Sequence, residues 1–174
     1  PVTAFTDFPV QLLVTFPDAD EWAVPSKMWH LDIPRLADDP HLPGVQPFFF
    51  IEEVAPGGGG TVVVTGSHRL LNGTGKRIPS SEIKSALAEE YDWFAHLLDK
   101  GESDRGQFLE EGAMADDVPI HVVELTGKPG DVVFMDMRVL HAPAPNAAKQ
   151  PRLMATARYI DEAMVPQLHG AAES

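Results

Sequence analysis

The sequence predicts a mainly β protein, a sandwich or barrel of short strands with one inserted α-helix. Short runs of β-branched and apolar residues recur along the chain, and turns rich in proline and glycine separate them. One longer segment, residues 81–100, instead repeats apolar residues at three- and four-residue steps, as a helix does. No repeat of fixed period and no linker divides the chain, so we expect a single domain over residues 1–174.

Four strands are predicted in the first half of the chain, at residues 10–16, 28–33, 48–54 and 61–65. The first is rich in β-branched and apolar residues and lies between two prolines, which predicts a buried strand. The segment 35–47 holds three prolines and is predicted to be a loop. Residues 57–60 are four glycines that we interpret as a turn, because a phosphate-binding loop would be followed by a lysine and a helix.

The second half begins with the helix at 81–100. Its apolar stripe comprises Ile83, Leu87, Tyr91, Phe94 and Leu98. An acidic loop is predicted at 101–119. The remaining strands are predicted at residues 121–125, 131–136, 139–142 and 152–160.

Charge and composition restrict the function. The formal net charge of −13 argues against nucleic acid or an anionic membrane as a partner, because both require a basic surface. The chain has no apolar run long enough to span a bilayer and no signal-peptide pattern, so we expect a cytoplasmic protein. It has no cysteine, so a metal ion would need nitrogen and oxygen ligands.

One motif in the second predicted strand indicates a metal site. Residues two apart on a strand point to the same face, so His30 and Asp32 would project together. Such a triplet also occurs by chance in many proteins. A second histidine from another strand, His141, would complete two imidazoles and one carboxylate on one side of a metal ion, which suits non-haem Fe(II). Arg152 opens the last strand and could bind the far end of a dicarboxylate.

These residues, in this order, resemble the phytanoyl-CoA dioxygenase family over about residues 10 to 160. The motifs that carry the resemblance are Trp29-His30-Leu31-Asp32, Gly66-Ser67-His68, Gly130-Asp131-Val132-Val133-Phe134, and His141 with Arg152. The resemblance implies a double-stranded β-helix (jelly roll) and an oxygenase that depends on Fe(II) and 2-oxoglutarate.

The resemblance also implies a role for each residue. His30, Asp32 and His141 would bind iron, and Arg152 would bind the distal carboxylate of 2-oxoglutarate. Alternate residues of the run 48–50 must face inward, and Phe48 is our candidate to flank the co-substrate. The other partners would be O₂ and a small-molecule substrate, with succinate and CO₂ as co-products. Because Asp32 is present where halogenating relatives have a small residue, we expect hydroxylation or another oxidation that starts with hydrogen abstraction.

Two other functions remain open. A cupin-type enzyme with another metal usually presents His-x-His, which this chain lacks. A non-catalytic jelly-roll binding module would not need all three ligands and the arginine. The other histidines have no partner at ligand spacing or lie in the helix or a strand-ending turn, and we expect them to be structural; they are His41, His68, His96, His121 and His169.

Overall fold

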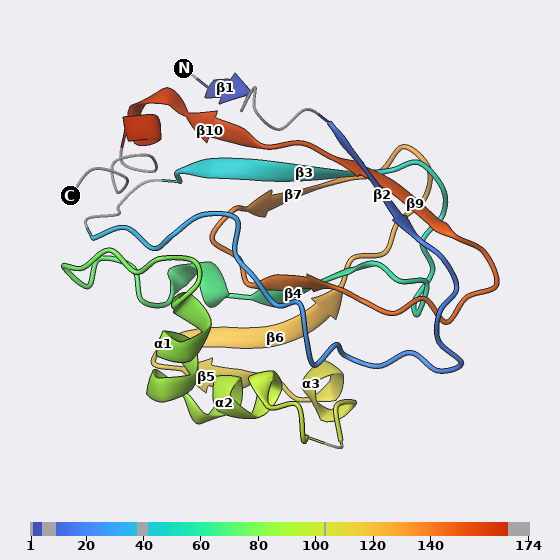
Figure 1. The fold of residues 1–174 in the computed structure, drawn as a ribbon, viewed down its shortest axis with the longest axis horizontal. Coiled ribbons are helices and arrows are strands. Elements are labelled where there is room, and N and C mark those ends of the chain that lie inside the picture. Colours follow the sequence, from blue (N-terminus) through green and yellow to red (C-terminus); the bar gives the residue numbers. More distant parts are fainter. Residues whose placement is uncertain (1, 5–9, 38–41, 103, 167–174) are drawn as a thin grey trace.

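The computed structural model describes residues 2–4, 10–37, 42–102 and 104–166. Their strands form two antiparallel sheets that face each other (Figure 1). This arrangement confirms the jelly roll. None of the helices in this part of the chain is long and apolar enough to cross a membrane.

The larger sheet has six strands in the order β1-β10-β3-β9-β2, with β7 paired to the other side of β3. Its strands are β1 (Val2–Ala4), β2 (Gln11–Thr15), β3 (Gly44–Phe50), β7 (Val132–Asp136), β9 (Arg152–Thr156) and β10 (Tyr159–Asp161). The smaller sheet has the order β5-β6-β4-β8. Its strands are β4 (Thr61–Thr65), β5 (Ala113–Ala115), β6 (Val118–Glu124) and β8 (His141–Pro143).

Three short α-helices lie against the outer face of the smaller sheet (Figure 1). They are α1 (Ile83–Glu90), α2 (Asp92–Leu98) and α3 (Gln107–Glu110). Two single-turn 3₁₀ helices complete the elements, at Ser67–Arg69 and Glu162–Met164.

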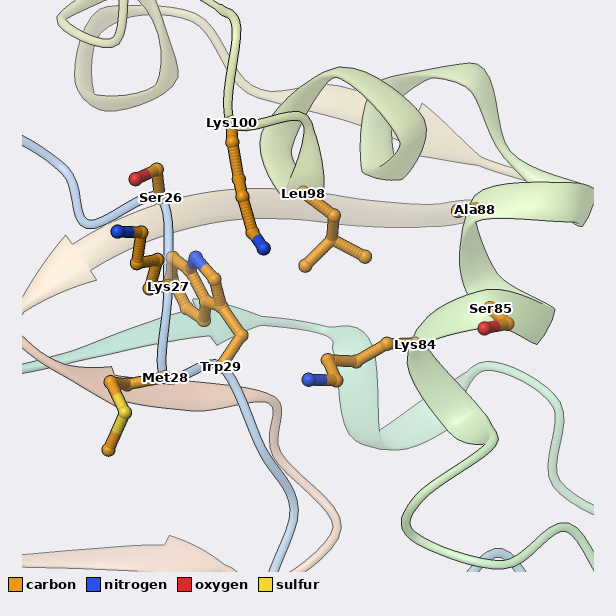
Figure 2. A pocket seen from close by; sticks show the side chains of 9 residues that line it. All are labelled: Ser26, Lys27, Met28, Trp29, Lys84, Ser85, Ala88, Leu98 and Lys100. Carbon is orange, nitrogen blue, oxygen red and sulfur yellow. The ribbon is translucent and has the colours of Figure 1, made fainter.

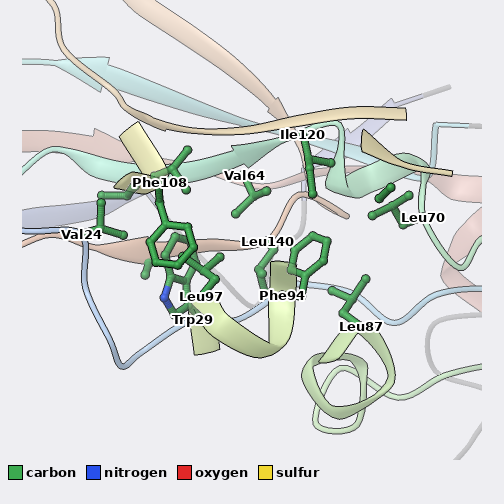
Figure 3. Close-up of a cluster of buried hydrophobic side chains, with 14 of the residues drawn as sticks. Val24, Trp29, Val64, Leu70, Leu87, Phe94, Leu97, Phe108, Ile120 and Leu140 are labelled. Atoms are coloured by element: carbon green, nitrogen blue, oxygen red, sulfur yellow. The ribbon is translucent and has the colours of Figure 1, made fainter. Parts of the chain in front are cut away.

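The hydrophobic core has two main parts, one on each face of the smaller sheet. Alternate residues of β4 point to opposite faces, so Val62 and Val64 pack against the helices while Val63 packs between the sheets. The part under the helices is the larger and includes Phe94 and Phe108 (Figure 3). The helices therefore bury the outer face of the sheet, while the space between the sheets holds a smaller apolar cluster beside the residues of the candidate site.

The prediction of a single helix at 81–100 is wrong, because the chain forms two helices with a break at Tyr91. The backbone of Tyr91 is extended, with φ −132° and ψ 116°. A straight helix of twenty residues would be about 30 Å long, whereas four paired strands span only about 15 Å. Leu87 before the break and Phe94 after it both pack in the core under the smaller sheet. A helical stripe carries no signal for this break, since both halves keep the same apolar spacing.

The prediction of a strand at 28–33 is also wrong. His30 makes one isolated bridge to His141, and its neighbours are in irregular conformation. Met28 has a positive φ of 65°, which interrupts any extended run.

Strand β2 forms where a strand was expected, but it is exposed rather than buried. Leu12, Val14 and the flanking Phe16 are 61%, 40% and 67% exposed. The reason is its position, since β2 lies at the edge of the sheet and pairs only with β9. A continuous apolar run does not distinguish an edge strand from a central one.

Several other strands and helices have bounds that differ from the predicted ones. Strand β3 begins at Gly44, inside the expected loop, and α3 and β5 both lie inside the expected loop at 101–119. The last expected strand divides into β9 and β10.

Candidate metal centre

Two segments far apart in the sequence meet at one backbone bridge. The amide of His30 donates to the carbonyl of His141 at 2.9 Å, and the amide of His141 donates back at 3.0 Å. Their imidazole rings therefore lie side by side, with centroids 4.2 Å apart. This bridge, rather than a strand, positions the first histidine.

Each histidine is oriented by the backbone two residues before it. Nδ1 of His30 lies 2.7 Å from the carbonyl oxygen of Met28, and Nδ1 of His141 lies 2.9 Å from that of Val139. A carbonyl oxygen only accepts, so both Nδ1 atoms carry the proton. Both Nε2 atoms therefore keep a lone pair, which is what a metal ligand requires.

Asp32 completes a set of three ligands. One ligand atom from each of His30, Asp32 and His141 lies within 4.8 Å of the others. Oδ2 of Asp32 is 3.6 Å from Nε2 of His141. It is buried and has no hydrogen-bond partner among the described residues. A buried carboxylate oxygen that has no hydrogen-bond donor and faces two imidazole nitrogens is a donor set that fits a metal ion.

The other oxygen of Asp32 has a partner. Nη2 of Arg158 donates to Oδ1 at 2.7 Å, and the Asp32 side chain is only 6% exposed. The carboxylate is thereby held with Oδ2 toward the histidines. Arg158 follows β9 in the chain, and the carboxylate that it binds is that of the candidate ligand.

Burial keeps His141 neutral. Burial lowers the pKa of the His141 imidazole from 6.5 to about 4, although the nearby Asp32 carboxylate opposes this shift. The ring is therefore uncharged at neutral pH, the state in which it can bind a metal.

Arg152 lies in the same cavity as the histidines. The cavity has a volume of about 230 Å³, and His30, His141, Phe48 and Arg152 all line it. The Arg152 side chain is buried, and burial lowers the pKa of its guanidinium while Glu124 raises it. Its Nη1 has only weak contacts, 3.5 Å to Oγ1 of Thr61 and 3.9 Å to the Met154 sulfur.

No ion pair joins Arg152 to a carboxylate in the described part of the chain, and its Nε has no hydrogen-bond partner there. A buried guanidinium that lacks an anion can bind one from solution. The predicted role of Arg152 as a carboxylate anchor is consistent with this geometry, and Phe48 lines the same cavity.

Two residues that position the ligands were missed. Ser67 accepts a hydrogen bond from the amide of Leu140, next to His141, and its carbonyl accepts one from Arg35. Arg35 is fully buried and lies close after Asp32 in sequence. Ser67 therefore connects both ligand-bearing segments. The Gly66-Ser67-His68 motif is visible in the sequence. The contacts that Ser67 makes depend on the tertiary fold and are not.

The glycine turn at residues 57–60 binds an acidic side chain through its backbone amides. The amides of Gly57 and Gly60 donate to the carboxylate of Glu124 at 2.7 and 2.9 Å, and Trp22 donates to it from its indole. Burial raises the pKa of Glu124, and these hydrogen bonds oppose the shift. The turn therefore holds an acidic side chain next to β4 and near Arg152.

The three other histidines in the described part of the chain lie outside the cavity. His68 lines a separate cavity, His96 is exposed on α2 and His121 lies on β6. His41 and His169 lie outside the described residues.

The structure is thus an antiparallel jelly roll that brings two histidines and one carboxylate together. A family model for phytanoyl-CoA dioxygenase matches residues 11–154. The chain therefore belongs to the phytanoyl-CoA dioxygenase family. No curated protein is significantly similar to it in sequence.

Solved structures share the fold. EctD from S. alaskensis, solved with 2-oxoglutarate and 5-hydroxyectoine, is 21% identical, with a TM-score of 0.51 over 93% of this chain and 45% of EctD. The epimerase SnoN from nogalamycin biosynthesis, solved with Fe³⁺, α-ketoglutarate and nogalamycin RO, is 19% identical, with a TM-score of 0.51 over 100% of this chain and 59% of SnoN.

HygX from Streptomyces hygroscopicus, solved with nickel and 2-oxoglutarate, is 16% identical, with a TM-score of 0.51 over 93% of this chain and 57% of HygX. The chain thus spans between 45% and 59% of the length of these three proteins.

Proposed function

We propose that this chain is an oxygenase that binds Fe(II) through His30, Asp32 and His141 and uses 2-oxoglutarate as co-substrate. The observation that carries the proposal is the buried, unpartnered Oδ2 of Asp32 facing the two histidines. The nearby guanidinium of Arg152, which lines the same cavity, is suited to bind the distal carboxylate of 2-oxoglutarate. Phe48 would pack against the co-substrate.

The protein would provide a fixed geometry. Nδ1–H of each histidine stays on its backbone carbonyl while Nε2 binds the metal, and Arg158 keeps one oxygen of Asp32 available. When bound, the iron would supply the activation of O₂, by which 2-oxoglutarate would be oxidised to succinate and CO₂ and one oxygen atom would enter the substrate. The cavity between the sheets would orient the co-substrate.

We propose hydroxylation of a small molecule as the reaction. All three protein ligands are present, including Asp32. Other outcomes are known on this fold, since SnoN is an epimerase and SnoK a carbocyclase. A product with one additional oxygen atom supports hydroxylation, whereas an isomer or a cyclised product contradicts it.

The first test is anaerobic addition of Fe(II) and 2-oxoglutarate to the purified protein. We expect the weak visible charge-transfer band of a metal-chelated 2-oxo acid. His141→Ala should abolish the band, because it removes a ligand. Arg152→Ala should leave iron bound and weaken 2-oxoglutarate binding at least tenfold, as expected for loss of a buried charged hydrogen-bond donor (about 1.5–3 kcal/mol).

Two variants away from the site serve as controls. His96→Ala and Arg77→Ala change exposed residues and should behave as the unchanged protein does. Absence of the band from the unchanged protein, or its persistence in His141→Ala, would contradict the proposal. An unaltered 2-oxoglutarate affinity in Arg152→Ala would remove that residue from its role.

A further inference from the structure

A second and larger cavity lies beside the metal centre. Its volume is about 450 Å³, within the range of small-molecule sites. The segment 26–29, helix α1 and the end of α2 with Lys100 surround it (Figure 2). The cavity at the histidines, at about 230 Å³, is smaller than most such sites. This smaller cavity has room for a small co-substrate. A substrate that binds at the same time must therefore extend outside it.

The larger cavity is basic in an acidic protein. The chain has only six lysines among 13 basic residues and carries a net charge of −13. Three of these lysines, Lys27, Lys84 and Lys100, line this one cavity. Figure 2 shows the side chains of Lys84 and Lys100 extending toward the same space.

These lysines have no ion-pair partner in the described part of the chain. None of the nine residues that line the cavity is acidic, and no ion pair or hydrogen bond joins the three ammonium groups to other described residues. Like charges gathered without a counter-charge repel one another, and a bound anion would relieve that repulsion. Ser26 and Ser85 also line the cavity and offer hydroxyl donors.

The cavity also has an apolar wall. The ring of Trp29 is 2% exposed, and its indole nitrogen already donates to the carbonyl of Pro25. Leu98 and Ala88 complete this wall. A ligand with a charged group and an apolar body would match both parts of the lining.

Met28 connects the two cavities, because it lines both of them. It also has the positive φ that directs its carbonyl oxygen to Nδ1 of His30. A molecule bound beside the lysines would therefore pass Met28 to reach the metal ligands.

We propose that the cavity lined by Lys27, Lys84 and Lys100 binds a phosphate-type group of the substrate, so that the substrate of this enzyme is anionic. The assignment of this anion as part of a substrate rests on the proposed oxygenase function. Lysine acts as a point charge for phosphate, whereas the planar fork of Arg152 suits a carboxylate. The two cavities would thus separate the substrate from the co-substrate.

The test is calorimetric titration of metal-free protein with inorganic pyrophosphate at constant low ionic strength. We expect saturable binding of one pyrophosphate per chain. Replacing any one of the three lysines by glutamine should raise the dissociation constant about fivefold, the effect of one unit charge at about 4 Å in water. The triple variant Lys27→Gln, Lys84→Gln, Lys100→Gln should show no saturable binding.

The control is the same charge change elsewhere. Lys128→Gln and Lys149→Gln alter exposed lysines outside this cavity and should change the dissociation constant less than twofold. The proposal is overturned if the unchanged protein does not bind pyrophosphate, or if the triple variant binds it as tightly as the unchanged protein.

The metal site is tested separately in the same variants. The triple variant should still form the Fe(II)–2-oxoglutarate band, because none of its changes touches a ligand. If the unchanged protein binds pyrophosphate through these lysines but never forms the band, the anion site is supported and the oxygenase function is overturned.

Discussion

Single backbone carbonyls set the chemistry of the two histidines. The carbonyl two residues earlier fixes the proton on Nδ1 in both His30 and His141, although one residue is exposed and the other buried. Arg158 performs the corresponding task for Asp32, since it binds one carboxylate oxygen and leaves the other toward the imidazoles. Such neighbours of metal ligands usually affect metal affinity strongly.

Arg158→Gln should therefore weaken Fe(II) binding about tenfold or more, by releasing Asp32 from its orientation. Arg158→Lys should recover part of the loss, because it restores the charge without the planar fork. The measurement is anaerobic Fe(II) titration of the metal-free protein.

Arg138→Gln is the matched control for this prediction. Arg138 forms an equally short ion pair, 2.7 Å to Asp136, that includes none of the candidate ligands, and its loss should leave the Fe(II) affinity close to that of the unchanged protein. Equal Fe(II) affinities in Arg158→Gln and the unchanged protein would show that Arg158 does not position the ligand.

Among the elements, the glycine turn before β4 depends most directly on residue size. A Cβ atom on Gly60 would lie 2.2 Å from the carbonyl oxygen of Leu125 and 3.0 Å from Cγ of Glu124. Because a backbone oxygen cannot move aside as a flexible side chain can, the close pairing of β4 with the end of β6 requires glycine at this position.

Gly60→Ala should lower the free energy of unfolding by about 1–3 kcal/mol, the usual effect of overpacking. It should also disturb Glu124, which accepts a hydrogen bond from the Gly60 amide. Chemical denaturation measures the change. Gly106→Ala is the control, since a Cβ there meets only the Asp104 carboxylate at 3.6 Å. Equal stability of the two variants would contradict this account of the turn.

For the molecule as a whole, burial of the His141 imidazole makes stability depend on pH. In metal-free protein the pKa of His141 is lowered from 6.5 to about 4 by burial. The unfolded chain therefore binds a proton at this ring at a higher pH than the folded chain does. The stabilising effect of the neutral ring is complete above about pH 6.5 and is lost as the pH falls toward 4.

Unfolding by urea should accordingly require about 2 kcal/mol less at pH 5 than at pH 7 through this group. His141→Asn keeps an amide donor for the Val139 carbonyl but does not titrate, so its stability should change less over the same interval. His96→Asn, a change at an exposed residue, should retain the slope of the unchanged protein. An equal slope in His141→Asn would assign the pH dependence to other groups.

Much of this molecule could be predicted from local sequence. Strand β4 was predicted with its observed bounds, and β7 within one residue, because an apolar β-branched run between turns favours a strand by itself. The candidate site residues His30, Asp32, His141 and Arg152 were identified by their order and spacing, and their roles in binding remain predictions. The single domain over residues 1–174 also remains a prediction.

What the sequence alone determined was the set of short strands, the β fold class and the side chains suited to a metal ion, since these follow from residue type and local period. The tertiary structure decided which neighbours those side chains meet. It replaced the expected strand at His30 by one bridge to His141, broke the helix at Tyr91 and brought three lysines together from segments up to 73 positions apart. The physical reason is that pairing and packing between distant segments depend on the whole fold, and no local pattern encodes them.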